Sequence, residues 1–175
     1  VPFKPLTLLA RFRKPSVDCV PSRGGCDTGG GETSKRGCGY PSVASVDLAA
    51  FAHNLAHLRS CAPSSLQMAI IKADAYGHGL LPLAQAALGA GADWLGVAQL
   101  AEAFELRVGL DSAGISRDSA PILAWISTSG SDFESAIRAD IDLSVSWTWV
   151  LDEICAAARL CGRPARIHVK VATGM

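Results

Sequence analysis

Short apolar runs alternate with segments of helical periodicity from residue 40 to the end of the chain. The apolar runs are too short for helices, and they are bounded by turn residues, as strands are. Strands that alternate with helices pair in parallel through right-handed crossovers. The sequence therefore predicts an α/β protein with a parallel sheet. The predicted strands are residues 67–71, 94–98, 121–126, 141–145 and 167–171, and the predicted helices are residues 48–58, 80–88, 100–107, 131–137 and 147–158.

Five strand–helix units fit either an open doubly wound sheet or part of an eight-stranded barrel of the TIM type. No glycine-rich phosphate-binding motif follows a predicted strand, so a nucleotide-binding open sheet loses support. The sequence ends directly after the fifth predicted strand. We expect a partial (β/α)8 barrel that contains about five of the eight units.

Two local patterns give the expected limits of helices. Gly109 closes the third predicted helix, and the polar residues 110–120 that follow it are predicted to form a loop. Ser131 and Glu134 have the spacing of a capping box, which predicts that a short helix begins there.

Residues 1–40 differ in composition from the rest of the chain. They carry seven Lys or Arg against three Asp or Glu, whereas residues 41–175 carry nine against thirteen. Glycines are scattered through this segment among Pro, Ser and Arg without a helix or strand period. We predict a poorly ordered basic head at 1–40 and a barrel domain at 41–175. Such a head could contact RNA, but a solvated leader is the reading that its composition favours.

Composition also excludes several classes of partner. The net charge is zero, which argues against a nucleic-acid-binding protein. No apolar run reaches the roughly 18 residues that a membrane span needs. The six cysteines lack the spacing of a zinc site, and His53 and His57 have no third ligand, so no metal site is predicted. A reduced, cytoplasmic protein fits this cysteine pattern best.

Lys72 is the residue that points most directly to chemistry. It ends the first predicted strand, and a turn containing Gly77, His78 and Gly79 follows it. In barrels built from strand–helix units, this end of a strand lies at the functional rim. Apolar walls around an amine favour its neutral, nucleophilic form, which can form a Schiff base with an aldehyde. A surface lysine is the alternative for an arbitrary strand end.

Residues 71–79, with the sequence IKADAYGHG, resemble the pyridoxal phosphate attachment signature of alanine racemases. Residues 168–175, HVKVATGM, resemble a later barrel-strand motif of the same family. The resemblance covers residues 40–175 and does not include the head. Supporting segments lie in the family's order at residues 46–48, 54–55, 91–93, 97–98, 102–103 and 105–107.

The resemblance implies a bacterial, cytoplasmic, homodimeric enzyme that interconverts L- and D-alanine and supplies D-alanine for peptidoglycan. Its fold would be an eight-stranded α/β barrel followed by a separate β domain. Lys72 would form the Schiff base with pyridoxal phosphate and act as the base on one face of the substrate. Tyr76 would bind the cofactor phosphate. Lys170 matches a position that is carbamylated in some members.

Two departures limit what the resemblance implies. The family's opposite-face base is a tyrosine of the later domain, and neither it nor the arginine at the pyridine nitrogen has a counterpart here. We therefore expect these 175 residues alone to be inactive. Ala172 also stands where the family usually has Asp, which puts a carbamate on Lys170 in question.

The alternative function is a non-catalytic barrel of the kind that maintains the cellular supply of pyridoxal phosphate.

Overall fold

The computed structural model describes residues 45–171, 173 and 174, so the predicted head at 1–40 and Ala172 lie outside the described residues. The remaining chain alternates between strands and helices, as predicted. The elements are α1 (Leu48–Cys61), β1 (Met68–Ile70), α2 (Lys72–Gly77), α3 (Leu80–Gly89), β2 (Trp94–Gln99), α4 (Leu100–Ser112), the 3₁₀ helix η1 (Arg117–Ser119), β3 (Ile122–Ile126), α5 (Phe133–Arg138), β4 (Ile141–Val145), α6 (Thr148–Cys161) and β5 (Ile167–Val169).

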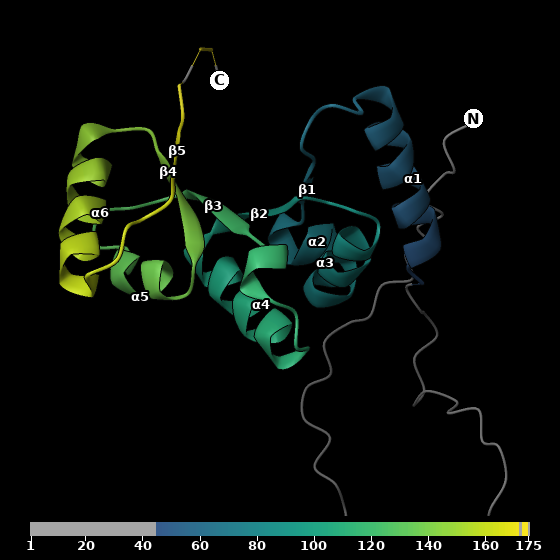
Figure 1. Cartoon of the computed structure of the whole chain (residues 1–175), viewed down its shortest axis with the longest axis horizontal. Coiled ribbons are helices and arrows are strands. Elements are labelled where there is room, and N and C mark those ends of the chain that lie inside the picture. The colour runs from purple at the N-terminus through teal and green to yellow at the C-terminus, as the bar shows by residue number, and fades with distance from the viewer. Residues whose placement is uncertain (1–44, 172, 175) are drawn as a thin grey trace, which may run out of the picture. The chain divides into compact units, whose positions relative to one another are not determined.

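The five strands form one parallel sheet in the order β1-β2-β3-β4-β5. Each strand lies beside the next one in the chain, and helices connect them (Figure 1). A doubly wound sheet reverses its strand order at a switch point, whereas a barrel adds each strand in sequence. The strand order therefore confirms the predicted α/β class and the partial TIM-type barrel.

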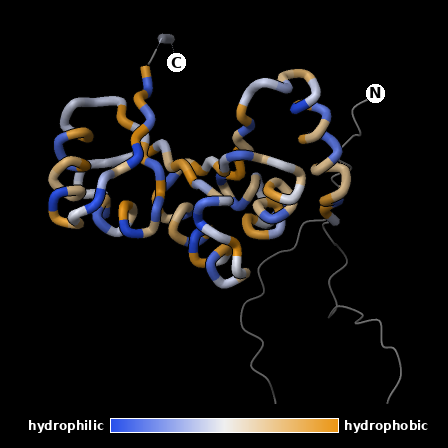
Figure 2. The backbone as a smooth tube through the Cα atoms, viewed as in Figure 1, coloured by the Kyte–Doolittle hydropathy of each residue, from blue (hydrophilic) through white to orange (hydrophobic). Residues whose placement is uncertain are grey.

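One face of the sheet is covered by helices. Leu95, Val97, Ile122 and Leu143 are fully buried on this face, and α4 contacts both β2 and β3. In Figure 1 the helices α3, α4 and α5 lie below the strands, and Figure 2 shows that the strands themselves are mostly hydrophobic. Burying each such side chain stabilises the fold by about 1.5–3 kcal/mol, so this layer is the core.

The opposite face carries different side chains, because successive residues of a strand point to opposite sides. In a complete barrel this face is the interior. Gly96 lies here, where a Cβ atom would come within 2.6 Å of Ile70 Cδ1 and 3.0 Å of Met68 Sδ. A glycine therefore lets the Ile70 and Met68 side chains of β1 pack against the main chain of β2 at this point, and a larger residue would displace them. Among the described residues, β1 and β5 each pair with a strand on one side only.

The expected limits of two helices were wrong. Helix α4 continues through Gly109 to Ser112, and η1 occupies part of the predicted loop. A Cβ atom at position 109 would lie 3.1 Å from Leu81 Cδ1, so the glycine permits close packing of α3 on α4 and does not end the helix.

The capping box predicted at Ser131 and Glu134 does not form. The residue that caps α5 is Asp132, whose carboxylate accepts a hydrogen bond from the Ser135 N–H at 2.9 Å. Glu134 instead pairs with Arg138, one helical turn further on. Aspartate and serine are both good N-caps, and the sequence offered the two side by side.

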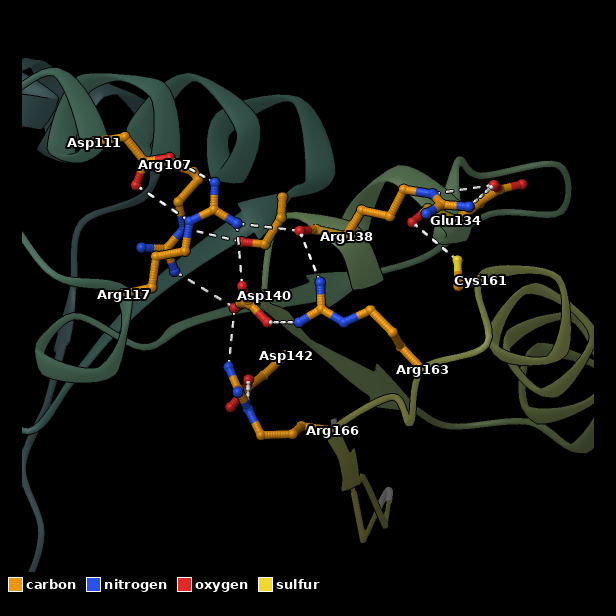
Figure 3. Close-up of polar contacts among 11 residues, drawn as sticks. Arg107, Asp111, Arg117, Glu134, Arg138, Asp140, Asp142, Cys161, Arg163 and Arg166 are labelled. Atoms are coloured by element: carbon orange, nitrogen blue, oxygen red, sulfur yellow. Dashed lines mark hydrogen bonds and ion pairs between the residues drawn. The ribbon is translucent and has the colours of Figure 1, made fainter.

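A network of arginines and acids lies at the amino ends of the strands (Figure 3). The Asp140 carboxylate, just before β4, forms ion pairs with Arg117 at 3.1 Å and Arg163 at 2.6 Å. Its main-chain carbonyl accepts a hydrogen bond from Arg166, and Arg107, only 2% exposed, donates to the carbonyls of Ala120 and Ala139. This network joins α4, η1, β4 and the start of β5.

Among the described residues, none of the helices combines the length and the hydropathy that a membrane span requires.

Candidate active site

A hollow of about 470 Å³ opens on the interior face of the sheet, toward the carboxyl ends of the strands. Lys72, Tyr76 and Lys170, which the sequence singled out, all line it. The structure therefore brings together residues that are up to 98 positions apart in the chain. The other lining residues are Met68, Ile70, Leu123, Trp125, Ser144, His168 and Val169.

Lys72 lies just beyond the end of β1. The strand ends at Ile70, and Ile71 is buried and donates its N–H to the carbonyl of Gly96 at 2.9 Å. Lys72 itself is half-buried. Its Nζ lies 5.8 Å from the centre of the Tyr76 ring, within the roughly 6 Å reach of a cation–π contact. The amine therefore faces an aromatic neighbour from its own segment.

The segment after Lys72 winds with the opposite hand from an ordinary helix. Four successive residues of α2, Ala73 to Tyr76, have φ of 52–55°, although none of them is glycine. Each left-handed residue costs roughly 1–2 kcal/mol because Cβ approaches the following carbonyl oxygen. The sequence predicted a turn here from its glycines, but nothing in Ala-Asp-Ala-Tyr predicts this conformation. Surrounding contacts must hold it in place.

Several hydrogen bonds hold the left-handed segment from both ends. The Ala75 N–H donates to the carbonyl of Ile71 at 2.9 Å, and Ala75 is almost completely buried. The Asp74 carboxylate accepts a hydrogen bond from the Leu80 N–H at 2.7 Å, where α3 begins. The carbonyl of Asp74 also accepts from the Gly79 N–H. These contacts connect the segment to the strand before it and the helix after it.

Glu102 contacts the same segment from the next strand–helix unit. Its Oε1 accepts a hydrogen bond from the Ala73 N–H at 2.6 Å. Its Oε2 accepts from the N–H groups of Ala98 and Gln99, where β2 passes into α4. Sequence reasoning missed this role. The Gln99-x-x-Glu102 spacing would have indicated a helix cap, but not the contact with Ala73.

A second missed residue lies below Lys170 on the interior face. Asp142 lies within β4 and is only 1% exposed, although it is an acidic residue. Its carboxylate accepts from Trp94 Nε1 at 3.0 Å, pairs with Arg166 Nε at 2.6 Å, and lies 3.1 Å from His168 Nε2. The partners satisfy a carboxylate that burial would otherwise disfavour. The signal in the sequence was an aspartate inside an apolar run.

Lys170 is exposed at the edge of the hollow. Its N–H donates to the carbonyl of Val145 at 2.8 Å, which continues the pairing of β4 and β5. Two residues earlier, His168 is held by Asp142 and meets the Trp94 ring edge-on at 6.3 Å. The end of β5 is therefore fixed both by its main chain and by a side chain on the interior face.

This arrangement can hold a small aromatic aldehyde that carries an anionic group. A volume of about 470 Å³ falls in the usual range of roughly 300–1,000 Å³ for small-molecule sites. Leu123 and Trp125 provide apolar surface, the Lys72 amine provides a nucleophile, and the Tyr76 side chain, 60% exposed, can donate a hydrogen bond. The residues present therefore fit pyridoxal phosphate.

The fold and this hollow define a partial α/β barrel with an amine at the carboxyl end of its first strand. The family model described as the N-terminal domain of alanine racemase matches residues 46–175. The chain belongs to that family. It is 54% identical over 136 residues to an alanine racemase of Beutenbergia cavernae, a match that covers 78% of this chain and 34% of the relative. An alanine racemase of Frankia casuarinae is 46% identical over 134 residues.

The solved structures that this chain resembles are also alanine racemases. The alanine racemase of Streptomyces coelicolor A3(2) superposes with a TM-score of 0.69 at 44% identity, over 73% of this chain and 33% of that one. The alanine racemase of E. faecalis superposes with a TM-score of 0.63 at 31% identity, over 74% of this chain. The chain spans about a third of the length of the curated relatives it matches.

Proposed function

We propose that this chain is the cofactor-binding barrel portion of a pyridoxal-phosphate-dependent alanine racemase. The observation that carries the proposal is that Lys72, Tyr76 and Lys170 line one hollow at the carboxyl ends of the strands. The racemase relatives support the reaction, which interconverts L- and D-alanine. The activity would supply D-alanine for peptidoglycan in a bacterial cytoplasm.

Lys72 has two roles in this proposal. Its amine is the point of covalent attachment, and it moves a proton to and from one face of the substrate α-carbon. When bound, pyridoxal phosphate withdraws electrons from that carbon, which makes its proton removable. The position of Lys72 supports these roles because the residue lines the hollow and its amine lies beside the Tyr76 ring.

Tyr76 and Lys170 would hold and orient the cofactor in the hollow. The Tyr76 phenol is exposed at the hollow and is able to donate a hydrogen bond to a phosphate oxygen, while its ring contacts the Lys72 amine. Lys170 lies at the opposite wall, where it provides positive charge or, if carbamylated, a hydrogen-bond acceptor. Its anchoring to Val145 supports a fixed position for either form.

Inversion of a stereocentre requires an acid or base on each face of the carbon. Lys72 supplies one, and by the family resemblance a tyrosine of a second subunit supplies the other. We therefore propose that racemisation takes place in a homodimer that includes the remaining two-thirds of the relatives' length.

Covalent labelling tests the proposal. The chain is incubated with pyridoxal phosphate and reduced with borohydride, and the labelled peptide is identified by mass spectrometry. Label at Lys72, absent from Lys72→Ala and retained in Lys170→Ala, is the expected result. Absence of label at Lys72 would overturn the proposal.

A second experiment separates a racemase from a non-catalytic carrier of the cofactor. The chain is joined to the remaining two-thirds of the Beutenbergia cavernae relative, and conversion of L- to D-alanine is measured. We expect activity that Lys72→Ala abolishes. A chimera that labels at Lys72 but does not racemise alanine would favour the non-catalytic carrier.

A further inference from the structure

Among the hydrogen bonds of the described residues, a single side chain of the β2–α4 unit reaches the main chain of the left-handed segment 73–76. That side chain is Glu102. Its two oxygens have separate tasks. Oε2 accepts from the Ala98 and Gln99 N–H groups and so caps α4, whereas Oε1 reaches across to the Ala73 N–H. One carboxylate therefore connects the ends of two neighbouring strands.

The Ala73 N–H has particular importance because of its position. It directly follows Lys72 and is the first amide of the left-handed segment. Four non-glycine residues keep positive φ there, a conformation that persists only when neighbouring groups fix it. Asp74 connects the segment to the start of α3 through Leu80, and Glu102 fixes the first residue of the segment, the near end, through Ala73. The near end sets the direction in which the Lys72 side chain leaves the backbone.

We propose that Glu102 is a positioning residue for Lys72, which acts by holding the left-handed segment through the Ala73 N–H. The proposal rests on the proposed function, because the orientation of Lys72 is measured through its attachment to pyridoxal phosphate. Glu102 does not line the hollow and so acts only through the backbone.

Glu102→Gln separates the two tasks of this side chain. Glutamine has one acceptor oxygen, which can still cap α4 at Ala98 and Gln99, but its amide then presents a donor to the Ala73 N–H. Glu102→Asp keeps the charge but is one methylene too short to reach both sites. Glu105→Gln is the matched control, since Glu105 is an exposed acid on the same helix.

Two measurements on the full 175-residue chain test the proposal. Amide hydrogen exchange reports the Ala73 N–H and, separately, the amides of α4. The rate of borohydride-trapped labelling by pyridoxal phosphate reports the reactivity of Lys72. In Glu102→Gln we expect Ala73 to exchange at least about tenfold faster, the scale of one hydrogen bond to a charged group, with α4 unchanged. Labelling at Lys72 falls in Glu102→Gln and Glu102→Asp and is unchanged in Glu105→Gln.

The other outcomes overturn the proposal. Unchanged exchange at Ala73, or labelling at the wild-type rate despite faster exchange, would show that Glu102 does not position Lys72. Wild-type labelling in Glu102→Asp would show that its charge, not its contact, matters. Loss of protection throughout α4 would make Glu102 a general stabiliser of the fold. If the wild-type chain takes no label, the proposed function fails, and exchange at Ala73 alone decides whether Glu102 holds the segment.

Discussion

Gly96 on β2 lies so close to Ile70 on β1 that a Cβ atom at position 96 would stand 2.6 Å from Ile70 Cδ1. The two residues are also partners in the register of the sheet. Ile70 lines the hollow two positions before Lys72. The packing of one glycine therefore affects the wall beside the proposed attachment site.

Gly96→Ala is expected to push Ile70 into the hollow. Because Ile70 is 42% exposed it can move, so the loss of stability should be modest, about 1–2 kcal/mol. The labelling of Lys72 by pyridoxal phosphate should fall at the same time. Urea unfolding and the labelling rate measure the two effects. Gly89→Ala is the control, since nothing lies within 4 Å of a Cβ atom there; equal effects at both positions would contradict the prediction.

Tyr76→Phe isolates the contribution of the phenol group. Phenylalanine keeps the ring near the Lys72 amine but cannot donate a hydrogen bond to phosphate. We expect affinity for pyridoxal phosphate to fall about tenfold, the scale of one hydrogen bond to a charged group. Affinity for pyridoxal, which lacks the phosphate, should not change. Spectrophotometric titration with both compounds makes the comparison, and an equal loss for both would argue against phosphate binding by Tyr76.

Asp140 should make the stability of the fold depend on pH in the acid range. Burial would raise the pKa of this carboxyl, but hydrogen bonds and charge from Arg117 and Arg163 hold it below its ordinary value. The folded state therefore binds the proton more weakly than the unfolded state does. The stabilisation is present above the ordinary aspartate pKa of about 4 and is lost as pH falls through the lower, folded value.

Urea midpoints measured between about pH 6 and pH 3 test this dependence. Asp140→Asn should be less stable than the wild type at neutral pH by about 1–2 kcal/mol, and the difference should shrink on acidification. Asp118→Asn, an exposed residue of η1, provides the control. A difference that stays constant with pH would show that the ion pairs of Asp140 contribute no stability.

The β5 edge should promote association of the 175-residue polypeptide. Among the described residues β5 pairs only with β4, and Val169 on this strand is 75% exposed. An apolar edge strand is a template for pairing with another chain, and lysine on an edge opposes such pairing. Val169→Lys should therefore lower light scattering at a given concentration. Leu160→Lys on α6 changes an equally exposed residue away from any edge, and an equal benefit from it would contradict edge pairing.

The sequence predicted the elements that depend on local pattern. Apolar runs located the five strands, and their alternation with helices predicted a parallel sheet. These features follow from periodicity, which the chain reports directly. Tyr76 and Lys170 were singled out by the family resemblance of residues 71–79 and 168–175, and not by periodicity. Whether Lys72, Tyr76 and Lys170 perform their expected roles stays a prediction.

What the sequence did not predict depends on contacts between distant residues. Gly109 looked like a helix end because glycine ends helices, yet here it makes room for Leu81 of another helix. Asp142 lies within the predicted strand 141–145, but its burial depends on Trp94 and His168, which are far from it in the sequence. The left-handed segment could not be predicted either, because its residues prefer other conformations and only tertiary contacts select this one.

The left-handed segment has a consequence for protein engineering. A lysine copied alone into the first strand of another barrel would leave the backbone along an ordinary right-handed or extended path and would point elsewhere. The transferable unit is the whole of residues 71–80, together with a carboxylate from the next strand–helix connection to receive the Ala73 N–H. A design that grafts this reactive amine must therefore carry over two adjacent repeats of its host barrel.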